Sequence, residues 1–163
     1  MKKLILLLFI PLLSFSQEDI ERYKVYDTEN IYTSLLLDSA TGDIWQLQIG
    51  LSDTDQVKTK LNNYAQAESV EEITNSWNKR MKEWEEEYNS KPDSIVSAED
   101  KEYWKPYSLK ETIERSIVAQ NGRFKLYPTG NMWNFIMVDV IDGRTWQVQW
   151  STKENERIVR RFW

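Results

Sequence analysis

Apolar and polar positions alternate in two stretches near the ends of the chain, and both stretches predict antiparallel β-strands. The apolar runs lie at 31–37 and 132–138, and the strictly alternating segments lie at 45–49 and 146–150. A turn sequence with one glycine, Gly42 or Gly143, separates each run from the alternating segment after it. Because a tight hairpin needs a residue with positive φ, each glycine predicts a β-hairpin whose second strand buries one face.

The two stretches are copies of one sequence. Residues 22–51 and 123–152 align without a gap at an offset of 101 positions and share ten identical residues. Self-similarity of this extent indicates a repeated structural unit. We therefore expect an α+β fold with two antiparallel β-meander repeats, at 22–62 and 123–163, in one shared sheet or in two packed sheets.

Helical periodicity fills the segment between the repeats, residues 68–121. Ser69 and Ser108, each with a Glu three residues later, form capping boxes, which mark helix N-termini. An apolar stripe at helical spacing follows the first box and consists of Val70, Ile73, Trp77, Met81, Trp84 and Tyr88. The second box predicts a helix that runs to a cap at Gly122. We expect the apolar stripes of this helical insert to cover one face of the antiparallel sheet.

The first residues of the chain have the layout of a secretory signal peptide, at residues 1–16. Lys2 and Lys3 precede an apolar run of about ten residues, and small residues come just before Gln17. The alternative is an N-terminal membrane anchor, but a spanning helix needs about twenty apolar residues. We therefore expect cleavage near Gln17, export to the periplasm or the medium, and a single mature domain, 17–163, with no membrane span.

The composition narrows the functional classes open to such a domain. The chain has no cysteine and no histidine, which excludes disulfides, Cys–His and Ser–His nucleophilic catalysis, and the usual zinc ligands. Its formal net charge of −5 argues against nucleic acid as a partner. The five glycines form no phosphate-binding loop. We expect neither a cofactor nor a metal.

The hairpin sequences resemble two known kinds of protein. Residues 126–150, LYPTGNMWNFIMVDVIDGRTWQVQW, are similar to the YPTxN and DGRxWQVQW segments of small exported bacterial proteins with no assigned activity. The first repeat departs from this motif at Asp27 and Asp43. Residues 37–45, LDSATGDIW, resemble the hairpins of quinoprotein-type β-propellers, but two copies cannot close a propeller. Neither resemblance transfers a functional residue to this chain.

Asp38 and Asp139 occupy matching positions at the entry to the two hairpin turns. As a pair they would suit the acid and base of a glycosidase if their carboxyl groups lay about 5–9 Å apart. The alternative is that each carboxylate accepts hydrogen bonds from the backbone of its turn, a common use of Asp. We favour the turn role and keep a carboxylate-dependent carbohydrate enzyme as an alternative function.

Amide and aromatic side chains give the best candidates for ligand binding. Amides donate and accept hydrogen bonds, and exposed aromatic rings stack on sugars or apolar groups. The candidate ligand-binding residues are Tyr32, Trp133, Trp150, Gln46, Gln48, Gln147 and Gln149. The alternative is a solvated strand face for the amides and a core position for the rings. We expect Trp45 and Trp146 to anchor the core, so that the repeats pack through their indole-bearing sides.

These observations favour an exported, non-catalytic binding or interaction protein that uses the repeated hairpins as its scaffold. Its partner would be a protein or glycan of the cell envelope or the exterior. An exposed strand edge or the aromatic–amide face would make the contact. A structural or assembly component of the envelope is a further alternative, and it would self-associate without a ligand. The sequence leaves the oligomeric state open.

Overall fold

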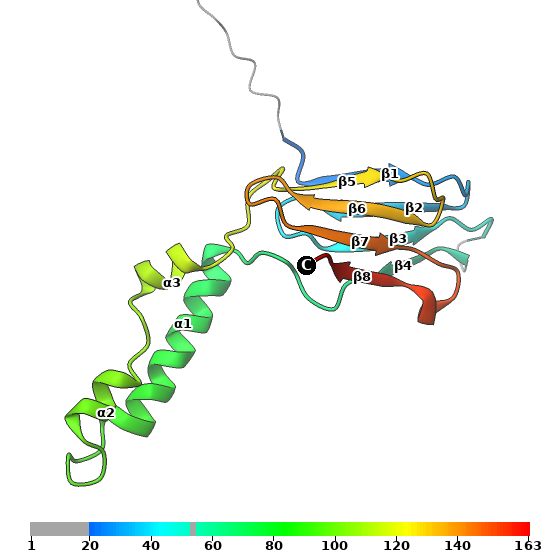
Figure 1. Cartoon of the computed structure of the whole chain (residues 1–163). Helices are drawn as coiled ribbons and strands as arrows, with labels where there is room; N and C mark the ends of the chain where they lie inside the picture. The colour runs from blue at the N-terminus through cyan, green and yellow to red at the C-terminus, as the bar shows by residue number, and fades with distance from the viewer. Residues whose placement is uncertain (1–19, 53–54) are drawn as a thin grey trace, which may run out of the picture.

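The computed structural model describes residues 20–52 and 55–163 and contains two four-stranded antiparallel sheets (Figure 1). Sheet 1 consists of β1 (Tyr23–Asp27), β2 (Thr33–Asp38), β3 (Ile44–Gln48) and β4 (Val57–Lys60), in that order. Sheet 2 consists of β5 (Phe124–Pro128), β6 (Asn134–Asp139), β7 (Thr145–Gln149) and β8 (Ile158–Arg161), with a short 3-10 helix (Glu154–Glu156) before β8. The predicted α+β fold with two β-meanders is confirmed. The predicted signal peptide, 1–16, lies outside the described residues.

The two sheets share one strand order and one register. Tyr23 pairs with Asp38 across β1 and β2, and Phe124 pairs with Asp139 across β5 and β6, 101 positions later. The other strand pairs follow the same offset. The glycine of each hairpin turn has a positive φ, 76° in sheet 1 and 78° in sheet 2, as the turn sequences predict.

The two sheets pack face to face and share one core. Its buried members are Leu35, Leu37, Ile44, Ala67, Phe124, Leu126, Phe135, Met137, Trp146, Val148 and Trp150. Phe124 and Trp146 meet edge to face with ring centroids 5.9 Å apart, an arrangement that aromatic pairs favour. Because the chain has no cysteine, this apolar burial takes the place of disulfides in holding the sheets together.

Sheet 2 stacks on sheet 1 in the same orientation, as one layer repeated above another. Figure 1 shows the strands of sheet 2 over their counterparts in sheet 1 and running in the same directions. Leu35 of β2 is fully buried, while its counterpart Ile136 of β6 is 37% exposed. One residue earlier the burial is reversed, since Phe135 is buried and its counterpart Ser34 is only partly buried. Successive strand residues point to opposite faces, so each sheet buries the face that the other leaves outside.

The prediction that both indole-bearing sides meet in the core is wrong for sheet 1. Trp146 is buried in the core, whereas Trp45 lies on the outer face of its sheet and is partly exposed. The Nζ atoms of Lys58 and Lys60 lie 4.5 Å and 5.8 Å from the centroid of the Trp45 ring. The alternation is as predicted, but alternation alone does not say which face of a strand turns inwards.

The insert forms a helical arm that projects away from the two sheets (Figure 1). It contains α1 (Val70–Trp84), which continues as the π-helix η2 (Glu85–Asn89), and then α2 (Ala98–Tyr103) and α3 (Leu109–Arg115). Both predicted capping boxes are present, at Ser69 and Ser108. α3 ends before the predicted cap at Gly122, because the backbone of Ser116 is already extended.

The prediction that the helical stripes cover a sheet face is wrong. The stripe of α1 packs within the arm, where Nε1 of Trp77 donates to the carbonyl of Tyr107 (2.8 Å) and Nε1 of Trp84 donates to the carbonyl of Lys101 (3.0 Å). Each sheet already covers the inner face of the other, so the arm buries its apolar side against itself. Among the described residues, no helix combines the length and apolar character that crossing a bilayer requires.

Candidate functional site

The predicted aromatic residues do not form one open stacking platform. Trp150 is fully buried, and its Nε1 donates to the carbonyl of Met132 (2.9 Å). Trp133 packs against the core and lies 4.5 Å from Trp150 between ring centroids. Tyr32, in the loop between β1 and β2, is 46% exposed. Of these three rings, Tyr32 is the one most open to solvent, while Trp150 has no free face for a ligand.

The predicted glutamines divide between the interior and the surface. Gln46 lies between the sheets and is 3% exposed, and its Oε1 has no hydrogen-bond partner among the described residues. Gln48 shares the inner face of sheet 1 with Gln46. Gln147 and Gln149 lie on the outer face of sheet 2, where their amides donate to a side-chain oxygen (3.0 Å) and a backbone carbonyl (2.8 Å). The structure therefore does not bring the four amides to one surface.

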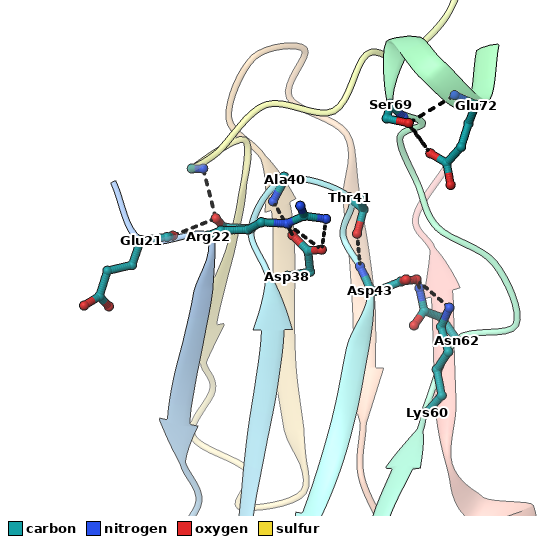
Figure 2. A network of polar contacts seen from close by, with 12 residues as sticks. Glu21, Arg22, Asp38, Ala40, Thr41, Asp43, Lys60, Asn62, Ser69 and Glu72 are labelled. Carbon is teal, nitrogen blue, oxygen red and sulfur yellow. Dashed lines mark hydrogen bonds and ion pairs between the residues drawn. The ribbon is translucent and has the colours of Figure 1, made fainter. Parts of the chain in front are cut away.

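Arginine side chains hold the two candidate carboxylates in their turns. Oδ2 of Asp38 lies 2.9 Å from Nη2 of Arg22, and Oδ1 accepts the backbone N–H of Ala40 at 2.9 Å (Figure 2). Burial alone would raise the pKa of Asp38, but the hydrogen bonds from Arg22 and Ala40 outweigh it and hold the pKa below its ordinary value. Asp139 is fully buried, and its Oδ2 accepts a hydrogen bond from Nε of Arg123 (2.9 Å). These contacts occupy lone pairs that an acid–base catalyst would need.

The same end of the molecule joins the sheets to each other and to the segments that lead into and out of the arm. Oγ of Ser39 accepts the backbone N–H of Gly122 (3.0 Å), and the carbonyl of Ser39 accepts that of Phe124 (2.8 Å). The side chain of Asn62, after β4, accepts the backbone N–H of Ile44 at 2.9 Å, and it also contacts Asp43 (Figure 2). This polar junction fixes the stacking of sheet 2 on sheet 1 at the point where the chain passes between them.

A groove of about 680 Å³ runs beside the edge strands β1 and β5. Lys24 and Lys125, at matching positions of the two strands, line it together with Tyr26 and Arg123. Lysine on an edge strand hinders the pairing of a further strand. The two lysines therefore hinder the pairing of a partner's strand along this edge.

The outer face of sheet 1 is an apolar surface open to solvent. Its apolar residues are Tyr23, Val25, Leu36, Trp45 and Leu47, and Ser34, Lys58 and Lys60 lie on the same face. Tyr23 and Val25 are 52% and 54% exposed, and the other three apolar residues are partly exposed. The counterparts of the five apolar residues in sheet 2 are the core residues Phe124, Leu126, Met137, Trp146 and Val148. The face thus has the residue types of a sheet–sheet interface without a second sheet against it.

Sequence reasoning missed this surface although the signal is present. The repeat alignment matches each of the five apolar residues of this surface with an apolar residue of the second repeat. The alignment does not say which of the two matching faces is buried. Placing both indole-bearing faces in the core requires two layers with mirrored faces. The stacking in one orientation leaves one of the two faces outside.

A second group of exposed aromatic rings lies on the arm, at the end of α2. Tyr103 is 77% exposed and Trp104 is 56% exposed. Trp104 stacks on Tyr88 of η2, with ring centroids 6.1 Å apart. Because the arm projects away from the sheets (Figure 1), this aromatic group is separate from the outer face of sheet 1.

The described residues hold no group of three or more acidic side chains arranged to bind a metal ion. Comparisons with protein-family models, with curated proteins and with solved structures found no match to this chain.

Proposed function

We propose that this protein is an exported, non-catalytic interaction protein that binds another protein molecule through the outer face of sheet 1. The signal-peptide layout of residues 1–16 supports export. The lack of histidine and cysteine supports binding without catalysis. So do the arginine contacts of Asp38 and Asp139, and for this reason we do not propose the carbohydrate enzyme.

The observation that carries this proposal is that the exposed outer face of sheet 1 corresponds, position by position, to the buried inner face of sheet 2. Val25 on the outer face of sheet 1 is 54% exposed, whereas its counterpart Leu126 is 3% exposed in the core. A contiguous apolar patch on a soluble domain marks an interaction site. Covering such a patch is favourable by roughly 25 cal/mol for each Å² of apolar surface removed from water.

The surroundings of the indole ring favour a protein partner over a glycan. The ammonium groups of Lys58 and Lys60 lie over the ring of Trp45, so a sugar would have to displace them before it could stack there. The aliphatic side chains of Val25 and Leu36 lie beside the ring on a strand surface. Such a surface fits the packed, apolar centre of a protein–protein interface.

A photo-reactive amino acid at Val25, introduced in cells that export the protein, tests the proposal. We expect irradiation to give covalent adducts with a protein. Ile31 is 81% exposed but lies in a loop outside the face, so the same probe there is the matched control and should give few adducts. No adduct at Val25, or equal yields at the two positions, would contradict the proposal. If the same probe at Trp104 gave adducts and the probe at Val25 gave none, the interaction would lie on the arm.

A further inference from the structure

We propose that the partner of the outer face of sheet 1 is the outer face of sheet 2 in a second copy of this chain, so that copies stack head to tail. The proposal rests on the proposed function, because it names the partner of the same face. The outer face of sheet 2 carries Lys125, Tyr127, Asn134, Ile136, Val138, Thr145, Gln147 and Gln149. Tyr127 and Ile136 are 47% and 37% exposed.

The contact between the two sheets of one chain is the template for this assembly. Because the sheets stack in one orientation, their contact joins two different faces of the β-meander. A contact between unlike faces is heterologous, and it leaves one face of each kind free at the two ends of the stack. A second copy placed by the same step would repeat the contact that each chain already makes internally.

The residues of the free faces match those of the internal contact. Four residues are identical between the inner face of sheet 1 and the outer face of sheet 2, at Lys24/Lys125, Tyr26/Tyr127, Gln46/Gln147 and Gln48/Gln149. Inside the chain, the hydroxyl of Tyr26 accepts the backbone N–H of Leu126 at 3.4 Å. In the stacked pair, the hydroxyl of Tyr127 would accept the backbone N–H of Val25, which is the counterpart of Leu126.

The hairpin turn of sheet 2 gives an independent indication. In sheet 1 the corresponding turn contacts the next sheet, where the carbonyl of Ser39 accepts the backbone N–H of Phe124 (2.8 Å). The counterparts of Ser39 and Ala40 are Val140 and Ile141, and these apolar residues are 47% and 54% exposed. Exposed apolar residues at the position that meets the next β-meander fit a further β-meander supplied by another chain.

The head-to-tail contact also suggests how the stack ends. Heterologous contacts close into a ring where the rotation per copy permits and otherwise extend as a filament. Rings of four-stranded β-meanders close with about 4–8 units. Each chain supplies two such sheets, so two, three or four copies would complete a ring of this kind.

Thiol cross-linking tests the contact, since the chain has no cysteine of its own. The variant Val25→Cys/Tyr127→Cys carries one thiol on each outer face, at positions that are 54% and 47% exposed and therefore tolerate substitution. Stacked sheets lie about 10 Å apart, a gap that a bismaleimide can bridge. We expect the purified double variant to form cross-linked dimers, and a ladder of larger species where more than two copies join. Each single variant, and the control pair Ile31→Cys/Tyr127→Cys, should remain uncross-linked.

Two other outcomes would overturn the head-to-tail stack. Val25→Cys alone should remain uncross-linked, so cross-linked dimers of this single variant at the yield of the double variant would mean that like faces meet. A sedimentation mass of one chain at all concentrations would exclude stacking. In the supporting case Val25→Glu should weaken self-association by about 100-fold, because the stack would bury an unpaired carboxylate, and Ile31→Glu should not. If the chain is monomeric and the photo-reactive probe at Val25 forms adducts with a different protein, this inference is refuted and the proposed function is supported. If the probe forms no adducts, both are refuted.

Discussion

Alanine substitutions at matched positions of the two sheets test the stacking in one orientation. Val25 of β1 is 54% exposed, and its counterpart Leu126 of β5 is 3% exposed. Leu35 of β2 is fully buried, and its counterpart Ile136 of β6 is 37% exposed. The buried member lies in sheet 2 in the first pair and in sheet 1 in the second. Alanine substitution should therefore destabilise the protein more in sheet 2 for the first pair and more in sheet 1 for the second.

The expected magnitudes follow from burial. Truncating a buried leucine to alanine costs about 2–5 kcal/mol, including the cavity it leaves, so Leu126→Ala and Leu35→Ala should each lower the free energy of unfolding by that amount. Val25→Ala removes two carbons that are half in water, which at roughly 0.8 kcal/mol per buried methylene amounts to about 1 kcal/mol or less. Ile136→Ala removes three carbons from a more covered site, for about 1.5 kcal/mol.

Urea unfolding followed by tryptophan fluorescence measures these differences. The measurements belong at protein concentrations where the midpoint does not change with dilution, because association would add its own stabilisation at the outer faces. If the two members of a pair cost the same, or if both costly substitutions fell in one sheet, the stacking of unlike faces would be refuted.

Three further predictions concern single polar groups. Gln46→Leu should raise the free energy of unfolding by about 1 kcal/mol in urea titrations, because it removes the buried Oε1 that lacks a partner; a loss of stability would indicate an unseen hydrogen bond. The pKa of Asp38 is below its ordinary value, so its stabilising contribution is present above about pH 4 and is lost as the pH falls through the folded-state pKa. The stability difference between the wild type and Asp38→Asn should therefore shrink on acidification, and a constant difference would contradict the pairing with Arg22. Ser69→Ala should destabilise the arm by about 1 kcal/mol through loss of the capping box, seen as faster amide exchange in α1, whereas Ser76→Ala on the exposed side of that helix should not.

The local structure of this chain could be predicted because local signals specify it. Gly42 and Gly143 mark hairpin turns since the backbone there needs positive φ, and both have it. Ser69 and Ser108 mark helix starts because a side-chain oxygen must accept the free N–H groups of the first turn. The predicted helix end at Gly122 is wrong. Gly122 does have a positive φ, but it lies in the turn before β5, and a turn can require positive φ just as a helix cap can.

The candidate site could be predicted only in part. The prediction of the binding rings and amides assumes that residues at matching positions of the two repeats have the same surroundings. In the structure Gln46 is enclosed between the sheets and Gln147 lies outside, and Trp45 is outside while Trp146 is enclosed. A period of two fixes which residues share a face of a strand and carries no information on which face another layer will cover.

The sequence by itself determined the strands, the turns and the existence of two like units, because each depends on neighbours along the chain. Only the tertiary structure decided that the units stack in one orientation and that the arm packs on itself. Those outcomes depend on which apolar surfaces can cover each other once the sheets have formed. Val25 and Leu126 occupy matching positions of the repeat, yet Val25 is exposed to solvent and Leu126 is buried in the core.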